Sequence, residues 1–179
     1  INPLCGWLSP VALFVVMFYS YCKRFTAFAH IVLGISLGIA PVGAYMAVTG
    51  SSTIECWILA LVVMTWCSGF DIIYALQDAD YDRAHGLHSI PSHFSARTSL
   101  IISALLHIAS VALLVWFASY QPQSWLLYLG CTLFAAILTL EHILVTPTKQ
   151  RNIGIAFGNL NAMASVTLAV CLILNLLIY

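Results

Sequence analysis

The sequence is poor in charged residues. Only 7% of its 179 residues are Asp, Glu, Lys or Arg, whereas about a quarter are charged in a typical soluble domain. Six acidic and six basic residues give a formal net charge of zero, which excludes the positively charged surface that nucleic acid requires. With 62% hydrophobic residues, the composition excludes an ordinary soluble domain and predicts a protein of the lipid bilayer.

Two further patterns are missing. The cysteines show no CxxC spacing, which argues against zinc ribbons and dithiol redox motifs and favours small apolar packing residues; they stand at positions 5, 22, 56, 67, 131 and 171. No segment alternates polar and apolar residues as the strands of a membrane barrel do. Because backbone polar groups must be satisfied within the protein in lipid, helices remain as the spanning structure.

What the sequence has instead is a series of uncharged or nearly uncharged apolar runs. A helix needs roughly 20 such residues to cross about 30 Å of hydrocarbon. Six runs satisfy this requirement, at about 4–22, 27–49, 54–76, 98–119, 124–145 and 153–179. We therefore expect an all-α bundle of six transmembrane helices that forms a single domain over residues 1–179.

The basic residues fall in alternate connections, after the first, third and fifth runs. They are Lys23, Arg24, Arg83, Arg97, Lys149 and Arg151. Because successive spans alternate in direction, these three connections share one face of the membrane, and the positive-inside rule makes that face cytoplasmic. The sequence therefore predicts a multi-pass protein, of the inner (plasma) membrane, with these connections in the cytoplasm.

The stretch "GFDIIYALQDADYDRAHGLHSIP", residues 69–91, holds four of the six acidic residues. If the third span continues as helix, Asp71, Tyr74, Asp78 and Asp82 follow the spacing i, i+3, i+7 and i+11 and share one face. Asp71 would lie inside the bilayer edge, where an ionisable side chain is costly. It is therefore a candidate functional residue that faces the bundle interior.

Asp78 and Asp82 point two carboxylates the same way, with no basic residue between them. Such a pair repels unless a cation is present, and Mg²⁺ suits it because Mg²⁺ takes one or two protein carboxylates and adds water and phosphate oxygens. The pair therefore suggests a diphosphate substrate, while Asp80 would point elsewhere. An alternative zinc or iron site would combine Asp82 with the loop histidines His85, His88 and His93.

The first span ends in "FYSYCKRF", which places Tyr19, Lys23 and Arg24 on the same side of the membrane as the acidic stretch. Basic residues at a helix end commonly anchor the helix to lipid headgroups. The functional alternative is that Lys23 or Arg24 turns inward and neutralises a diphosphate leaving group.

The segment "YALQDADYD", followed by "GLHSIP", closely resembles the second aspartate-rich motif of the UbiA-type membrane prenyltransferases, particularly the 4-hydroxybenzoate polyprenyltransferases and their menaquinone-pathway relatives. Other segments are similar to further helices of the family in the same order: "LSPVALFVVMFYSYCKRFT", "LGISLGIAPVGAYMAVTG", "EHILVTP" and "IAFGNLNAMAS". The resemblance covers the whole chain.

The resemblance implies Mg²⁺-dependent transfer of a polyprenyl group from polyprenyl diphosphate to a small aromatic acid such as 4-hydroxybenzoate, in the biosynthesis of ubiquinone-type quinones. In the family, nine helices surround a cavity in which two aspartate motifs face each other across Mg²⁺ and diphosphate. Carried over by motif, Asp78 and Asp82 would bind the metal, Tyr74 is the motif's tyrosine, and Tyr19, Lys23 and Arg24 match the residues that bind the diphosphate. The predicted catalytic residues are Tyr74 and Asp71, the latter because of its depth in the span.

Nothing in residues 1–179 resembles the first aspartate motif of the family, NDxxDxxxD, which lies about three helices upstream of the helix that begins this chain. We therefore expect the six spans to be the last six of nine, in a C-terminal portion that is incomplete and inactive without an N-terminal segment carrying that motif. The alternatives are a menaquinone-pathway naphthoate prenyltransferase and a non-enzymatic membrane transporter or assembly protein.

Overall fold

A computed structural model of the chain describes residues 2–148 and 152–179. The helices follow one another as α1 (Pro3–Cys22), α2 (Ala29–Thr49), α3 (Ile54–Ala75), the 3₁₀ helix η1 (Leu76–Asp78), α4 (Ala79–Ala84), α5 (Ile90–His93), α6 (Ala96–Ala118), α7 (Trp125–Leu144), the π-helix η2 (Ile155–Leu160) and α8 (Asn161–Ile178).

Six helical segments are long and apolar enough to cross a membrane: Pro3–Cys22, Ala29–Thr49, Ile54–Ala84, Ala96–Ala118, Trp125–Leu144 and Ile155–Ile178. They confirm the predicted all-α fold of six spans. The largest difference in bounds is in the third, which continues through η1 and α4 to Ala84. The protein is therefore a multi-pass integral membrane protein.

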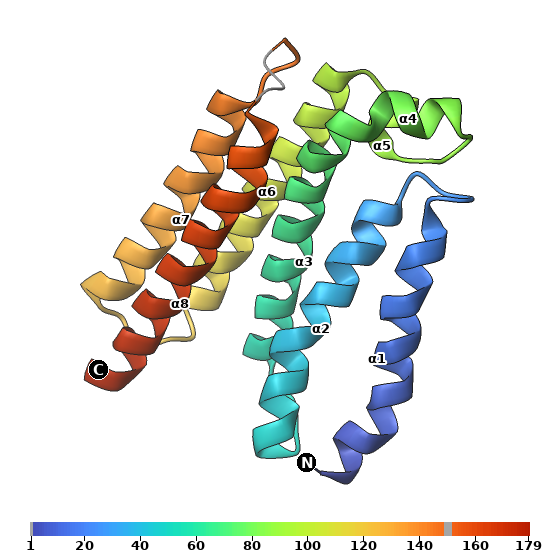
Figure 1. Cartoon of the computed structure of the whole chain (residues 1–179). Coiled ribbons are helices and arrows are strands. Elements are labelled where there is room, and N and C mark those ends of the chain that lie inside the picture. The colour runs from blue at the N-terminus through green and yellow to red at the C-terminus, as the bar shows by residue number, and fades with distance from the viewer. Residues whose placement is uncertain (1, 149–151) are drawn as a thin grey trace.

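Helix α3 is the centre of the bundle. It packs against α2 on one side and against α6 on the other, and α7 and α8 pack together beside them (Figure 1). The main apolar core joins α3 to the second half of the chain; it consists of Ile58, Val62, Leu114, Phe117, Phe134, Leu138, Ala164 and Leu168. In contrast, α1 packs on α2 and exposes most of its apolar side chains.

The contact between α2 and α3 depends on glycine. A Cβ atom at position 34 would lie 2.1 Å from the hydroxyl oxygen of Ser68 and 2.4 Å from the carbonyl oxygen of Met64, and one at position 38 would lie 2.8 Å from the carbonyl oxygen of Ala60. Because helices in lipid associate through close packing and polar contacts, small residues at a four-residue spacing allow two backbones to approach. Gly34 and Gly38 therefore set the distance between α2 and α3.

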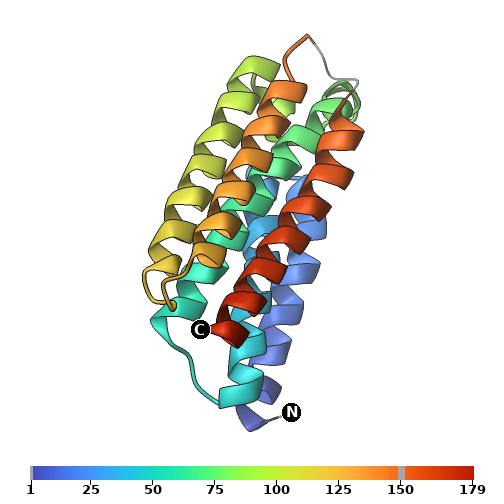
Figure 2. The same ribbon diagram turned by 90° about the vertical axis from the view of Figure 1, so that its left-hand side faces the viewer.

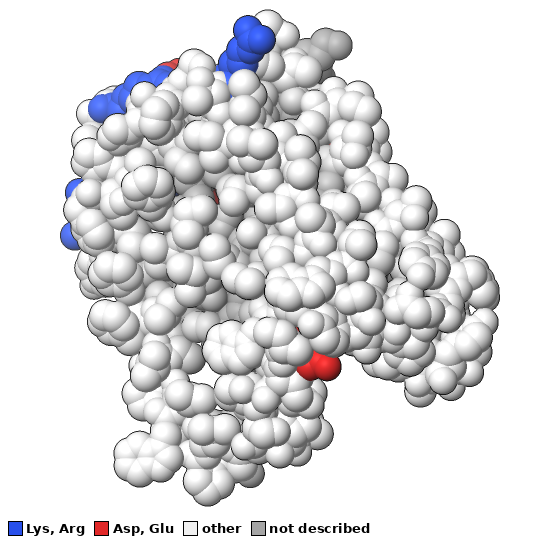
Figure 3. Space-filling model, turned by 180° about the vertical axis from the view of Figure 1, so that it is seen from behind, with Lys and Arg blue, Asp and Glu red and all other residues white. Residues whose placement is uncertain are grey.

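The basic side chains gather at one end of the bundle, as Figure 3 shows. Lys23 and Arg24 follow α1, Arg83 lies on α4 and Arg97 lies near the start of α6, while Lys149 and Arg151 lie outside the described residues. This end also carries α4 and α5 (Figure 1). The four described residues therefore share one side of the membrane, as the alternation of the spans requires.

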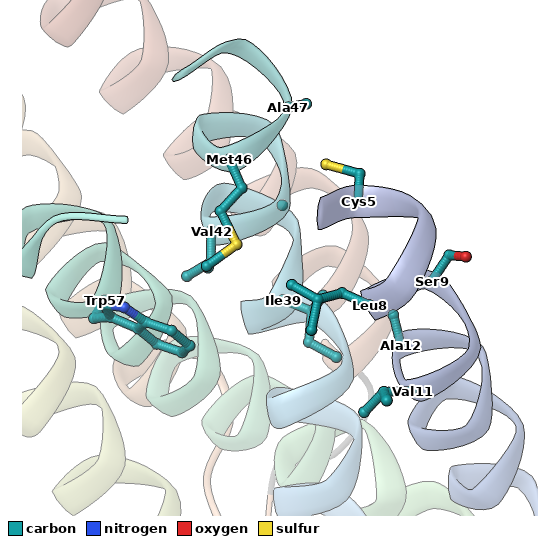
Figure 4. Close-up of a pocket in the computed structure, with 11 residues that line it drawn as sticks. Cys5, Leu8, Ser9, Val11, Ala12, Ile39, Val42, Met46, Ala47 and Trp57 are labelled. Atoms are coloured by element: carbon teal, nitrogen blue, oxygen red, sulfur yellow. The ribbon is translucent and has the colours of Figure 1, made fainter. Parts of the chain in front are cut away.

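A groove of about 380 Å³ opens between α1 and α2 at the opposite end of the bundle. Leu8, Ile39, Met46 and Trp57 are among its lining residues, and they extend toward the space between the helices in Figure 4. The lining is almost entirely apolar, and it lies at the end of the bundle opposite to the charged end described below.

The glycine contact predicts a stability effect. Replacing Gly34 with Ala should lower the melting temperature of the protein in detergent, with a loss of about 1–3 kcal/mol, because the new methyl group meets the backbone of α3. The matched control is Gly43→Ala, also on α2, where a Cβ atom has nothing within 4 Å. Equal melting temperatures for the two variants, measured by differential scanning fluorimetry, would contradict the role of Gly34.

Candidate active site at the charged end of the bundle

The acidic segment follows α3 through a change of helix type. The backbone winds as a 3₁₀ helix from Leu76 to Asp78 and returns to α-helix at Ala79. A 3₁₀ helix has 3.0 residues per turn, so residues after it are rotated relative to a continuous α-helix. The four residues of the predicted stripe do not share one partner: Asp71 and Asp82 contact residues of the α1–α2 half, whereas Tyr74, which like Asp71 precedes the 3₁₀ helix, contacts the C-terminal half.

Asp82 is buried and paired with Lys23. The side chain is only 2% exposed, and the Nζ of Lys23 donates to its Oδ2 over 3.2 Å. The backbone N–H of His88 also donates to the carbonyl oxygen of Lys23 over 2.6 Å, which joins the α1–α2 connection to the segment after α4. A buried carboxylate requires such a partner, so Lys23 points inward and supplies the opposite charge.

Asp71 is held by His30, a residue that sequence reasoning missed. The Nδ1 of His30 lies 2.6 Å from Oδ2 of Asp71, and the backbone N–H of Ile90 donates to Nε2 over 3.4 Å. Because Nε2 accepts that bond, the proton of the neutral ring is on Nδ1 and is donated to Asp71. A lone polar residue in the apolar run "AFAHIVLG" was the only sequence signal for it.

The two remaining acids of the segment have different surroundings. Asp80 is fully exposed and pairs with Arg83, whose Nη1 lies 2.7 Å from its Oδ1. Arg83 also donates to the carbonyl oxygens of Pro91 and Ser92 and so fixes α5 against α4. Asp78 is half-buried and has no hydrogen bond or ion pair within residues 2–148 and 152–179.

The residues at the end of α1 are divided between the two sides of the helix. Tyr19 is half-buried and close enough to Asp71 for the two side chains to interact electrostatically. Arg24 is exposed, with its guanidinium 5.4 Å from the ring centre of Tyr21. The structure therefore brings Tyr19 and Lys23 to the acidic residues and places Arg24 away from them.

An aromatic row leads from the middle of the bundle to this end. Trp66, Phe70 and Tyr74 follow the spacing i, i+4 and i+8 on α3, and Phe157 of η2 packs against Phe70 and Tyr74 with ring centres 5.5 and 4.3 Å apart. The next residue at this spacing is Asp78. The spacing of the α3 aromatics was visible in the sequence, but the contact with Phe157 was not.

The π-helix that carries Phe157 is stabilised by Asn161. Its Nδ2 donates to the carbonyl oxygens of Ala156 and Phe157 over 3.2 and 3.1 Å, and its Oδ1 accepts from Nε1 of Trp66 over 2.8 Å. These bonds join the π-helical segment to Trp66 of α3. Short π-helical segments are frequent at functional sites, and this one presents an aromatic ring to Tyr74.

The alternative metal site in the loop has little support. His88 and His93 contact each other, with Nδ1 and Nε2 3.1 Å apart, whereas His85 stacks on Tyr81. Among the described residues, no three His, Cys, Asp or Glu side chains are placed to hold a metal ion together, so a zinc or iron centre of these histidines is disfavoured.

A model of the UbiA prenyltransferase family matches residues 1–166. Among the similar curated proteins, the 4-hydroxybenzoate octaprenyltransferase of Edwardsiella ictaluri is 30% identical over 161 residues, which are 90% of this chain and 56% of that protein. The protein of the same name from Serratia proteamaculans is 32% identical over 137 residues, 76% of this chain and 47% of its own length. The chain thus spans about half the length of these relatives.

A solved structure is also similar. It is the apo structure of a UbiA homolog from Aeropyrum pernix K1, with a TM-score of 0.86 and 29% sequence identity. The match covers 98% of this chain and 65% of that one. The six-span arrangement is therefore shared over nearly the whole of this chain.

The contacts of His30 predict a local change in dynamics. Replacing His30 with Phe removes both the donor to Asp71 and the acceptor for Ile90, so amide hydrogen exchange should become at least several-fold faster around residues 87–94, as measured by mass spectrometry. His30→Gln, which retains one donor and one acceptor, should restore much of the protection. His85→Phe, at an exposed position, is the control, and exchange equally slow in the His30→Phe and His85→Phe variants would contradict the role of His30.

Proposed function

This chain belongs to the UbiA prenyltransferase family, and we propose that it contributes to a Mg²⁺-dependent transfer of a polyprenyl group from its diphosphate to 4-hydroxybenzoate in quinone biosynthesis. The names of the Edwardsiella and Serratia relatives support this acceptor. Since the chain spans about half their length, the activity is proposed for the protein as it occurs in the membrane. In this proposal the family's first aspartate motif, which residues 1–179 do not contain, would complete the site.

The observation that carries this proposal is the placement of three charges at one end of the bundle. Asp78 has no partner within the described part of the chain, and Asp82, four residues later, is paired with the ammonium of Lys23. Carboxylate oxygens are the ligands that Mg²⁺ prefers, and one or two of them suffice when phosphate and water complete the coordination. Asp78 and Asp82 therefore fit Mg²⁺, which when bound stabilises the negative charge of the diphosphate.

Lys23 has a role in the departure of the diphosphate. Its side chain is 31% exposed, so the ammonium can contact a ligand while Asp82 fixes its position. As the allylic carbon–oxygen bond breaks, negative charge accumulates on the leaving group, and a preorganised cation stabilises that charge. Tyr19, on the same helix, is the neighbouring hydrogen-bond donor in this proposal.

The other end of the reacting bond develops positive charge. The rings of Phe70, Tyr74 and Phe157 form a row that ends one turn before Asp78, and aromatic faces attract cations. The carboxylate of Asp71, oriented by His30, adds a fixed negative charge on the neighbouring side of α3. In this proposal these groups stabilise the prenyl cation, exclude water from it and leave an electron-rich ring carbon as its nucleophile.

The location follows from the same groups. The four described Lys and Arg residues lie at the end that carries Asp78 and Asp82, which by the positive-inside rule supports a site at the cytoplasmic face of the plasma membrane in this proposal. A polyprenyl chain would reach it from the bilayer, while the small aromatic acid would arrive from the cytoplasm.

Substitution of the two carboxylates tests the proposed site. In membranes that contain the whole protein, Asp78→Asn and Asp82→Asn should each reduce Mg²⁺-dependent prenylation of radiolabelled 4-hydroxybenzoate at least 100-fold, since the amide removes a charged metal ligand. Asp80→Asn is the matched control, because Asp80 is exposed and pairs only with Arg83 in the described structure. It should retain most of the activity.

The same assay separates the possible outcomes. Full activity in both the Asp78 and Asp82 variants, at protein levels verified by immunoblot, would refute the metal role. Wild-type membranes that prenylate 1,4-dihydroxy-2-naphthoate but not 4-hydroxybenzoate would show that the proposed acceptor is wrong while retaining the reaction class.

Lys23 gives an independent kinetic prediction. Lys23→Gln should raise the KM for polyprenyl diphosphate and lower kcat, together at least tenfold in kcat/KM, because the ammonium contacts the leaving group before and during bond cleavage. Arg24→Gln should have a much smaller effect, since Arg24 lies over Tyr21 and away from the acids. Kinetics in which the Arg24 variant is impaired and the Lys23 variant is not would reverse the assignment.

A further inference from the structure

A second groove lies between α6 and α7. Because α6 packs mainly on α3 and α7 packs mainly on α8, the two helices leave space between them. Figure 2 shows α6 and α7 side by side on the face turned to the viewer. Two cavities of about 490 and 250 Å³ adjoin there and share Ala104 and His142. Together they run from the start of α6 toward the middle of the bilayer.

This groove is separated from the Asp71–His30 pair by α3. Asp71 points toward α2, whereas the α6 side of α3 is occupied by Ser103, whose hydroxyl donates to the carbonyl oxygen of Gly69, and by the ring of His107. A Cβ atom at position 69 would lie 2.3 Å from that ring. The absence of a side chain at Gly69 therefore lets His107 sit against α3, behind the candidate active site.

Polar side chains lie in and behind the groove, within membrane-spanning helices, where apolar side chains are expected. His107 is 3% exposed, and its Nδ1 lies 3.0 Å from Nε2 of His142 and 3.8 Å from Oε2 of the fully buried Glu141. The second ring nitrogen of His142 has no hydrogen-bond partner in the described part of the chain. Polar side chains are costly within a span and commonly mark a binding site.

The mouth of the groove carries a positive charge. Arg97 lines the smaller cavity together with His142, and its guanidinium has no ion pair within residues 2–148 and 152–179. The deeper cavity is walled largely by small or apolar residues, including Ala104, Ala112 and Ala135. The groove thus offers a cation, then a hydrogen-bonding imidazole, and then an apolar channel, in that order from the membrane surface.

Three parts of one ligand match this order: a carboxylate for Arg97, a ring hydroxyl for His142 and a hydrocarbon chain for the channel. An acyl chain alone offers no polar group that could bond to the histidines. A free phosphate offers no hydrocarbon that could fill the apolar channel. We propose that the α6–α7 groove is a second binding site that takes a hydroxybenzoic acid bearing an isoprenoid chain. The identification of this ligand as the reaction product rests on the proposed function, and the site then holds product outside the catalytic cavity.

Direct binding tests the groove. The probe is tritiated 3-geranyl-4-hydroxybenzoate, added to the purified protein in lipid nanodiscs. Saturable binding is expected to weaken at least tenfold in Arg97→Gln and in His142→Phe. The methyl ester of the probe, which lacks the carboxylate charge, should bind the wild-type and Arg97→Gln proteins equally. His85→Phe is the matched histidine control, and its binding should equal that of wild type.

Several outcomes would overturn the proposal. Unchanged affinity in both groove variants, with melting temperatures equal to wild type, would show that the probe binds elsewhere. Equal competition by geranylbenzene would show that the groove selects only hydrocarbon. Loss of probe binding in Asp82→Asn, with full binding in Arg97→Gln, would place the probe solely at the diphosphate end.

The binding assay also separates this proposal from the proposed function. If the probe binds in an Arg97-dependent way but membranes show no prenyl transfer, the groove is an aromatic acid site and the proposed function is wrong. If membranes show prenyl transfer but probe binding does not depend on Arg97, the proposed function stands and the proposed second binding site is wrong.

Discussion

The close approach of α2 to α3 is the contact on which the charged end depends. The two helices are antiparallel, and their contacts follow one register: Gly38 meets Ala60, Gly34 meets Met64, and His30 meets Asp71. The connection before α2 continues this register, where Lys23 meets Asp82. A larger residue at either glycine would separate the backbones in lipid, and both charged or polar pairs lie further along the same interface.

Each side of α3 carries a different kind of chemistry. The side toward α2 holds charges, with Asp71 on His30. The side toward η2 holds aromatic rings that end at Tyr74, and the side toward α6 holds Gly69, against which His107 packs. One central helix therefore presents a charged surface, an aromatic surface and a separate polar groove, because its neighbours keep these surfaces apart.

Much of this architecture was predictable from the order of residues alone. Apolar runs of about 20 residues predict the spans, because a helix of that length crosses the hydrocarbon core of the bilayer. The basic residues in alternate connections predict which helix ends lie on the same side of the membrane. The sequence also placed Lys23 at the same end as the acids, but its pairing with Asp82 was not predicted. His30 and Phe157 were not predicted, because a lone histidine or phenylalanine in an apolar run gives no sign of the helix it will face.

The sequence by itself determined the membrane, the six spans and the side on which the aspartates gather, since each of these depends on hydrophobicity and charge summed over many neighbouring residues. Only the tertiary structure decided which acid has which partner. Asp82 pairs with Lys23 of the α1–α2 connection, α5 brings the N–H of Ile90 to His30, and Arg83 engages Asp80. Asp78 is the acid left without a protein partner among the described residues. The partners of Asp82 and Asp71 lie far apart from them in the chain, so local spacing does not encode these pairs, whereas the Asp80–Arg83 pair joins neighbours three residues apart.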